Sequence, residues 1–367
     1  MTRKQKGILL AIWLVTLFGL EGLSRTFFKL GLLHYIPFTS QQGHSNPRGF
    51  WQDSNPHFGV WHPKKAKFRH QSPCFDVVYQ SNQFGARDQE RNKKNTDGIT
   101  RAVILGDSFV EGYGVDESDR VSNQLEKKTG IEHLNFGTSG DFGSIQAWRQ
   151  YDTLVRQFDH NIVYIFFLPQ NDFADNNPNH FPKNRYRPYL KKTSPEHYKL
   201  YYSVSFPDRA RLETSTPSLW DKISTYSYFF NFIRNFNINL KRKFKKSVIH
   251  SYTHYTQDDL DKLLYTYKKI ITLAGEKKVI IVSIPRYPDF LWHQKNGYTF
   301  KLVDTLHQFA NTYPNVYYHD LLPDFVNYTK KTGRHVNQLN LKCDGHWSAL
   351  GHTVASESLL QAFKFLY

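Results

Sequence analysis

Three side-chain types that together carry out acyl transfer occur in two short motifs far apart in the chain. Ser108 ends the triplet Gly-Asp-Ser, directly after the apolar run at 102–105, and Asp344 and His346 lie in Asp-Gly-His-Trp near the C-terminus. A serine hydroxyl needs a base to take its proton, and a histidine base needs a carboxylate to hold its tautomer. The order nucleophile, carboxylate, histidine therefore predicts serine-dependent acyl transfer by Ser108, His346 and Asp344.

Two further segments supply hydrogen-bond donors for the oxyanion that such a reaction forms. The segment 135–140 (Asn-Phe-Gly-Thr-Ser-Gly) follows one expected strand, and Pro-Gln-Asn-Asp at 169–172 follows the next. The carboxyl ends of parallel strands meet at one edge of the sheet, where ligands bind. The N–H groups of Ser108 and Gly140 and the side chain of Asn171 are therefore predicted to form an oxyanion hole.

The elements that must position these groups follow an alternating α/β pattern from residue 101 onward. The apolar run at 162–168 is typical of a parallel strand buried on both faces. Thr256 and Asp259 at one end and Gly275 at the other are the capping signals of an amphipathic helix at 258–274. We expect strands at 102–105, 132–136, 162–168, 279–284 and 316–319, and helices at 121–128, 144–158, 258–274, 300–313 and 348–366. This alternation implies a parallel sheet with helices on both faces.

The four motifs, taken in order, resemble the blocks of the SGNH (GDSL-type) hydrolase superfamily. The resemblance rests on Ser108, Gly140, Asn171 and His346 in their motifs, and it covers about residues 101–367 without an insertion. It implies a flavodoxin-like three-layer α/β/α sandwich, the same four catalytic roles and no cofactor. The Asp-x-His-Trp form is similar to that of membrane-anchored, exopolysaccharide-linked members.

Three positions depart from the family pattern. Phe109 replaces the usual leucine, and Pro169 stands where a glycine usually precedes the asparagine of the third block, which predicts a different loop there. The carboxylate usually lies three residues before the histidine, a position that Cys343 occupies in this chain. Asp344 lies only two residues before His346, and we expect it to reach the far ring nitrogen.

Other candidate side chains are assigned structural roles. His352 lies within the expected C-terminal helix, and Asp107 is interpreted as a residue that stabilises the turn before Ser108. His62, His160, His180, His254 and His319 have no neighbouring signature. No cluster of histidines and carboxylates has metal-ligand spacing, so we expect no metal site.

The N-terminus has the pattern of a membrane segment. Arg3, Lys4 and Lys6 precede an uncharged stretch at 7–20, and an apolar stretch resumes after Glu21 and Arg25. An uncleaved anchor over 1–28 and a cleaved signal peptide are both consistent with this length, and the absence of a small-x-small cleavage site favours the anchor. Basic residues before the span predict a cytoplasmic N-terminus and an extracytoplasmic catalytic domain, periplasmic if the source is bacterial.

The rest of the chain divides into an extension, a catalytic domain and an insertion. Residues 29–100 are largely irregular apart from one strand at 75–79, and we expect this extension to pack on the catalytic domain at 101–367. An insertion at about 174–256 contains one helix with an apolar face formed by Leu219, Ile223, Tyr226, Phe230 and Ile233. Two interpretations remain open: a helix packed in the core, or one that lies on an anionic membrane with the basic run 241–246 beside it.

Cysteine usage and charge limit the compartment and the partners. The chain has two cysteines, Cys74 and Cys343, which form either a disulfide in an oxidising compartment or two separate buried thiols. Its formal net charge of +16 suits an anionic membrane or glycan, or serves solubility alone. The chain lacks zinc-finger spacing, RNA-binding strand motifs and a glycine-rich phosphate loop, so nucleic acid is not an expected partner.

These observations predict a membrane-anchored, outward-facing serine ester hydrolase. Its expected substrate is an O-acyl group, for example acetyl, on a cell-envelope or exported polysaccharide. Two alternatives remain: an O-acyltransferase that uses the same residues on a sugar acceptor, and a non-catalytic glycan-binding or assembly factor that keeps the fold.

Overall fold

A computed structural model describes residues 1–30, 32–33, 50–72, 74–96, 98–180, 185–195, 197–206, 219–244, 252–298, 300–342 and 344–367. The chain forms two compact units. The helical unit contains Met1–Gln42, Gln71–Phe75 and Ser215–Ser247, and the α/β unit contains Gly43–His70, Asp76–Thr214 and Val248–Tyr367. The predicted domain limits at residues 28 and 100 stay predictions, and each unit is described by itself.

The α/β unit is built around a parallel sheet. Its strands are β5 (Arg101–Leu105), β6 (Glu132–Asn135), β7 (Ile162–Phe167), β10 (Lys278–Ser283) and β11 (Val316–Asp320), in the order β11-β10-β7-β5-β6. Every pair is parallel. In chain order the strands lie 2-1-3-4-5, which is the flavodoxin-like arrangement. The predicted fold class is therefore confirmed.

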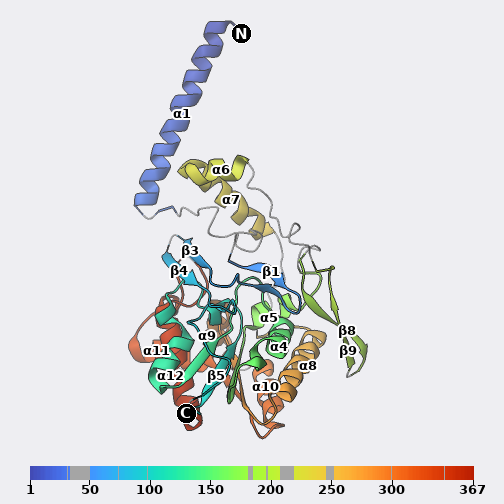
Figure 1. The fold of residues 1–367 in the computed structure, drawn as a ribbon. Coiled ribbons are helices and arrows are strands. Elements are labelled where there is room, and N and C mark those ends of the chain that lie inside the picture. The colour runs from blue at the N-terminus through green and yellow to red at the C-terminus, as the bar shows by residue number, and fades with distance from the viewer. Residues whose placement is uncertain are drawn as a thin grey trace. The chain divides into compact units, whose positions relative to one another are not determined.

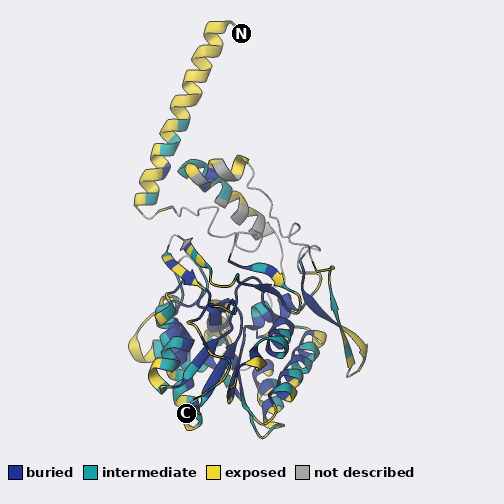
Figure 2. Ribbon diagram, in the orientation of Figure 1, coloured by how far each residue is buried: buried dark blue, intermediate teal, exposed yellow. Residues whose placement is uncertain are grey.

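Helices cover both faces of this sheet (Figure 1). On one face lie α3 (Val121–Thr129), α11 (Leu321–Thr332) and α12 (Ala349–Phe363), and on the other lie α4 (Ser144–Thr153), α8 (Gln257–Ala274) and α10 (Lys301–Asn311). Every residue of β5 and β7 is buried, so the core lies between the sheet and its two helical layers (Figure 2). Burial of this apolar surface is the main force that holds the layers together.

Local sequence signals set several of the helix ends as predicted. The Thr256 side chain accepts the Asp259 N–H in a capping box at the start of α8, and α3 ends at Gly130, which has a left-handed backbone. The helix predicted at 144–158 is shorter, because the helical hydrogen bonding of α4 ends at Thr153 and a 3-10 turn follows at Val155–Gln157.

The extension is more regular than its sequence predicts. Besides β4 (Phe75–Gln80), where a strand was expected, it contains β1 (Gln52–Asn55), β2 (Gly59–Trp61) and β3 (Lys67–Ser72), arranged as two-stranded sheets. The insertion adds another such sheet, β8 (Pro188–Ser194) with β9 (His197–Tyr202). β1 and β3 consist mainly of polar residues without apolar alternation, which is why the sequence did not indicate them. The helices α5 (Pro169–Asp175), α9 (Tyr287–Asn296) and α11 were also not predicted.

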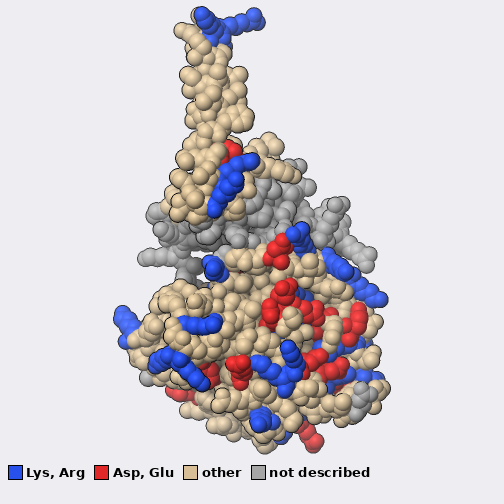
Figure 3. Space-filling model, turned by 90° about the vertical axis from the view of Figure 1, so that its left-hand side faces the viewer, with Lys and Arg blue, Asp and Glu red and all other residues tan. Residues whose placement is uncertain are grey.

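The helical unit contains α1 (Arg3–Lys29), α6 (Leu219–Tyr226) and α7 (Tyr228–Phe244). α1 is long and apolar enough to cross a membrane, a property that signal sequences share. Its surface is largely uncharged between the basic N-terminal tip and the pair Glu21–Arg25 (Figure 3). The prediction of a single helix in the insertion is wrong, because this segment forms the two helices α6 and α7. The Ser227 hydroxyl accepts the Phe230 N–H and so begins the second helix.

Two predictions concern residues outside the described part of the chain. The first is the disulfide between Cys74 and Cys343, which remains a prediction because Cys343 lies outside the described residues. The last two lysines of the basic run, at 245 and 246, are also outside it.

Candidate active site

The structure brings Ser108, His346 and Asp344 together in a chain of hydrogen bonds. The Ser108 Oγ lies 2.6 Å from His346 Nε2, and His346 Nδ1 lies 2.5 Å from Asp344 Oδ1. The serine and histidine are 238 positions apart in the chain, so the fold alone creates this contact. Because one ring nitrogen faces the hydroxyl and the other faces the carboxylate, the arrangement has the geometry of a nucleophile, base and orienting acid.

Asp344 reaches the histidine in spite of its shifted position in the sequence. Its Oδ1 also accepts the backbone N–H of His346 at 3.1 Å, so the carboxylate and the ring are held by the same short turn. Burial raises the pKa of Asp344, but the hydrogen bonds from His346 outweigh it and hold that pKa at about 2. The carboxylate is therefore charged at neutral pH, as the orienting role requires.

The histidine ring is fixed by aromatic neighbours. Tyr113 stacks on His346 with ring centroids 4.2 Å apart, and Phe109 lies at 4.9 Å in a tilted arrangement. Next to the ring, Gly345 packs so closely against Arg286 that an added Cβ would lie 2.2 Å from the guanidinium. A side chain at position 345 would therefore displace the Arg286 guanidinium.

Ser108 is placed at the point where the strand order of the sheet reverses. It begins α2 (Ser108–Glu111), directly after β5, and β5 lies between β6 and β7. Open α/β sheets bind ligands in the crevice at this position. Asp107 caps α2 by accepting the Phe109 N–H at 3.0 Å, which agrees with its interpretation as a turn residue, and burial raises its pKa.

The three predicted oxyanion donors lie on segments that meet at this edge. The Asn171 side chain, on the short helix α5, donates to Asp107 at 3.2 Å and keeps a second amide hydrogen. Pro169 is the first residue of α5, where its fixed φ suits a helix, so the segment expected to be a loop is helical in this chain. Among the described residues, no acceptor takes the N–H of Ser108 or of Gly140, and both residues are buried.

A buried glutamate that sequence reasoning missed holds the oxyanion segment. Glu111, at the end of α2, accepts the Ser139 N–H at 2.6 Å and the Ser139 hydroxyl. Trp51 Nε1 donates to the same carboxylate at 2.9 Å, and His62 Nε2 lies 3.1 Å from it. Burial raises the pKa of Glu111, but the hydrogen bond and the charge of His62 outweigh it and hold that pKa at about 2.

A second buried contact reaches the same segment from the insertion. The Arg185 guanidinium donates to Asp53 of β1 at 2.6 and 2.8 Å, to Asp141 at 3.3 Å and to the Gly140 carbonyl at 3.3 Å. Gly140 has a φ of +104°, a conformation that favours glycine, and Asp141 follows with a φ of +64°. The unusual backbone at Gly140 is therefore stabilised by partners from both the extension and the insertion.

No spacing in the sequence points to these contacts. Trp51 and His62 lie 60 and 49 positions before Glu111, in a segment whose sequence shows no regular pattern. The motif Trp61-His62-Pro63 lies in that segment, but it indicates no particular chemistry by itself.

The remaining histidines do not compete for the role of base. His352 is buried, where its Nδ1 accepts the Val121 N–H at 3.3 Å, and burial lowers its pKa to about 3. His319 Nε2 lies 2.9 Å from Asp324 Oδ2, so this ring is paired with a carboxylate other than Asp344. Within the described residues, no group of three or more histidines, cysteines or carboxylates could hold a metal ion.

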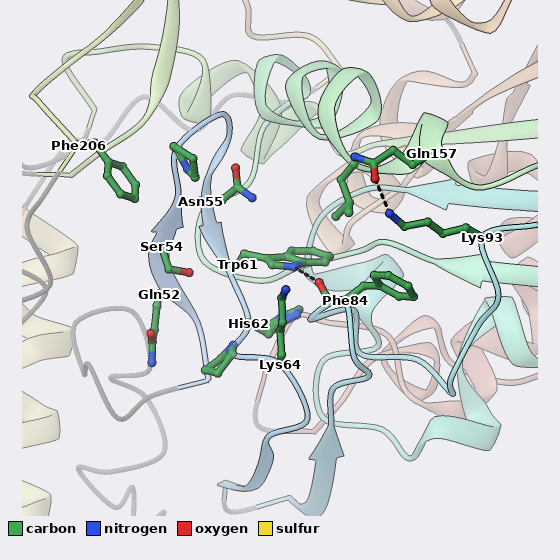
Figure 4. Close-up of a pocket in the computed structure, with 13 residues that line it drawn as sticks. Gln52, Ser54, Asn55, Trp61, His62, Lys64, Phe84, Lys93, Gln157 and Phe206 are labelled. Atoms are coloured by element: carbon green, nitrogen blue, oxygen red, sulfur yellow. Dashed lines mark hydrogen bonds between the residues drawn. The ribbon is translucent and has the colours of Figure 1, made fainter.

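A cavity of about 840 Å³ lies beside the extension, and His62 forms part of its wall (Figure 4). The side chains of Lys64 and Lys93 line it, and Lys93 donates to Gln157 at 2.6 Å. None of its described lining residues is a carboxylate; the others are Gln52, Ser54, Asn55, Pro56, Trp61, Pro63, Phe84, Leu154 and Phe206. Its described lining thus combines two lysines with several aromatic and apolar side chains.

Comparisons with known proteins find similarity only among solved structures. No family model and no curated protein match the chain. It is similar to a member of the lipolytic protein G-D-S-L family from Veillonella parvula, with 13% identity, a TM-score of 0.38, and coverage of 72% of this chain and 99% of that one.

It is also similar to a lipase/acylhydrolase from Enterococcus faecalis, with 12% identity, a TM-score of 0.37, and coverage of 73% and 96%. A salicylyl-acyltransferase from a tetracycline biosynthetic pathway has 13% identity and a TM-score of 0.36, over 74% of this chain and 57% of that one. At these identities and TM-scores, the similarities carry no argument about the activity of this chain.

Proposed function

We propose that the protein is an ester-acting enzyme of the SGNH type in which Ser108 is the nucleophile. The observation that carries this proposal is the hydrogen-bonded chain from Ser108 Oγ through His346 to Asp344, with distances of 2.6 and 2.5 Å. An ordinary helix-capping serine has no need for a histidine on its hydroxyl or for a charged carboxylate behind that histidine.

The reaction follows from the roles of these groups. His346 Nε2 takes the Ser108 proton as Oγ attacks the ester carbonyl, and Asp344 stabilises the imidazolium that forms. The N–H groups of Ser108 and Gly140 and the second amide hydrogen of Asn171 stabilise the developing oxyanion. His346 then protonates the leaving alcohol, and an acyl-enzyme on Ser108 remains. Water activated by His346 releases the acid.

The proposed substrate is an O-acyl group, for example acetyl, on an envelope or exported polysaccharide. We propose that α1 anchors the enzyme with its catalytic unit outside the cytoplasm, because basic residues precede the apolar stretch. Lys64 and Lys93, with no carboxylate among the described lining residues of the cavity, support an anionic substrate. A transferase would use the same residues and differ only in the acceptor that reaches the acyl-enzyme.

Release of acyl groups tests this proposal. The full chain in detergent should liberate acetate from an O-acetylated polysaccharide, and Ser108→Ala should abolish the release. If a sugar acceptor gains the acetyl group by mass while free acetate stays low, the protein is a transferase. If neither product forms and the folded protein still binds the polysaccharide, the catalytic proposal is wrong and the glycan-binding alternative stands.

The cavity makes a separate prediction about polymer binding. Replacing both Lys64 and Lys93 with alanine should raise KM for an anionic acetylated polysaccharide several-fold and leave kcat/KM for a small neutral ester unchanged, since a neutral ester carries no charge for these lysines to bind. The matched control removes the same charge elsewhere, with Lys127→Ala and Lys268→Ala, both exposed on helices. Equal effects of the two double variants would show that only net charge matters.

A further inference from the structure

The helices α6 and α7 expose a set of large apolar side chains. The exposed fraction of Trp220 is 43%, and Phe232, Phe236 and Leu240 follow one another at four-residue intervals along one side of α7. Leu219, Ile223 and Tyr226 are also exposed on α6. This helix pair therefore does not bury its apolar face within the unit, as a core-packing helix would.

The start of α7 is fastened to α1 by one carboxylate. Glu21 accepts the Ser227 hydroxyl at 2.7 Å and the backbone N–H groups of Tyr228 and Phe229 at 3.2 and 3.1 Å. These N–H groups belong to the first turn of α7, which has no intrahelical acceptors for them. Arg25 pairs with Glu21 at 2.8 Å and lies 5.2 Å from the Tyr228 ring centroid.

The position of Glu21 along α1 fixes the depth of this contact in a bilayer. A helix rises about 1.5 Å per residue, so Gly7 to Phe28 covers about 32 Å, close to the ~30 Å hydrocarbon core. Glu21 then lies about 10 Å inside the outer edge of that core, where its charge needs the donors that α7 and Arg25 provide. Interfacial amphipathic helices sink about 5–10 Å into the same boundary.

We propose that α6 and α7 lie in the outer membrane–water interface beside α1, with their apolar face in the lipid. Trp220 and Tyr226 are residue types enriched at this depth. The last four residues of α7 and the two that follow it in the sequence are Lys-Arg-Lys-Phe-Lys-Lys at 241–246, a basic run that complements anionic headgroups. The inference rests on α1 as an anchor and is independent of the chemistry proposed for Ser108.

Fluorescence quenching by brominated lipids tests the position of Trp220. The full chain is placed in nanodiscs of phosphatidylcholine and phosphatidylglycerol, with the phosphatidylcholine brominated either near the headgroup or near the end of the acyl chain. The emission of each tryptophan is the difference between wild type and its phenylalanine variant. Trp292→Phe is the matched control, since Trp292 on α9 is 40% exposed. Trp13→Phe reports on α1 itself.

The inference expects Trp220 to lose more than half of its emission when bromine lies near the headgroup, while Trp292 loses none and Trp13 is quenched by one of the two lipids. Quenching of Trp13 without Trp220 would overturn the inference and leave the anchor standing. A Trp220 that is shielded from aqueous iodide but not quenched by bromolipid would also overturn it, because protein would then cover the face. If Trp13 itself is not quenched, the anchor and the inference both fall.

Discussion

At the scale of single residues, the short spacing between Asp344 and His346 decides how the base is oriented. The family pattern places the carboxylate one position earlier, yet the 2.5 Å contact with Nδ1 shows that a two-residue spacing also reaches the ring, because the turn folds the carboxylate back onto its own histidine. This role could be predicted from the motif, whereas the stacking of Tyr113 on the ring could not.

Asp344→Asn should lower kcat about 10³- to 10⁴-fold with little change in KM, because the amide no longer stabilises the imidazolium or holds the productive tautomer. Steady-state kinetics on a small ester measures this. Asp324→Asn is a matched control, since Asp324 also pairs with a histidine, His319, at 2.9 Å outside the site. An equal loss in both variants would mean that Asp344 acts only through stability.

At the scale of elements, the ends of the strands place the catalytic groups. The extension stabilises the segment that carries Gly140 through contacts with Glu111. The positions of Ser108, Gly140 and Asn171 after three successive strands were predicted from the alternation of strands and helices in the sequence, whereas the flavodoxin-like strand order was implied only by the resemblance to the SGNH superfamily. The contacts of Trp51 and His62 with Glu111 could not be predicted from the sequence, because they join segments about 50 to 60 positions apart and depend on tertiary packing alone. Local patterns predict elements, and they do not predict such long-range polar contacts.

Glu111→Gln should lower kcat about 10²-fold at nearly constant KM. The amide turns one acceptor into a donor among Trp51, His62 and Ser139, so the segment that presents the Gly140 N–H shifts. Circular dichroism verifies the fold, and Asp152→Asn, which changes a half-buried ion pair on α4, serves as control. A folded Glu111→Gln variant with unchanged kcat would show that this carboxylate does not position the oxyanion segment.

At the scale of the whole molecule, buried histidines link folding stability to pH. Burial lowers the pKa of His352 to about 3 and the pKa values of His133 and His160 to about 4. As the pH falls, these histidines are protonated near pH 6.5 in the unfolded chain and only at a lower pH in the folded chain. Stability therefore falls as pH decreases from about 6.5 toward 4, by about 1.4 kcal/mol per pH unit for each proton. Asp344 and Glu111, with pKa values of about 2, lose their contributions below about pH 4.5.

His352→Asn keeps an acceptor for the Val121 N–H and removes one of these protons. Urea unfolding of the detergent-solubilised chain between pH 6.5 and 4 should therefore show a slope smaller by about 1.4 kcal/mol per pH unit. The exposed His197→Asn variant should keep the slope of the wild type. A His352→Asn slope identical to the wild type would mean that His352 is protonated equally in the folded and unfolded chains.

Covalent labelling with a serine-reactive probe measures whether Ser108 is an activated nucleophile. The full chain in detergent is treated with a fluorophosphonate serine probe, beside Ser108→Ala and His346→Ala. We expect labelling of the wild type on the peptide that contains Ser108, none in Ser108→Ala, and a strongly slowed reaction in His346→Ala. If the folded wild-type protein does not label, or if Ser108→Ala labels equally, Ser108 is not an activated nucleophile.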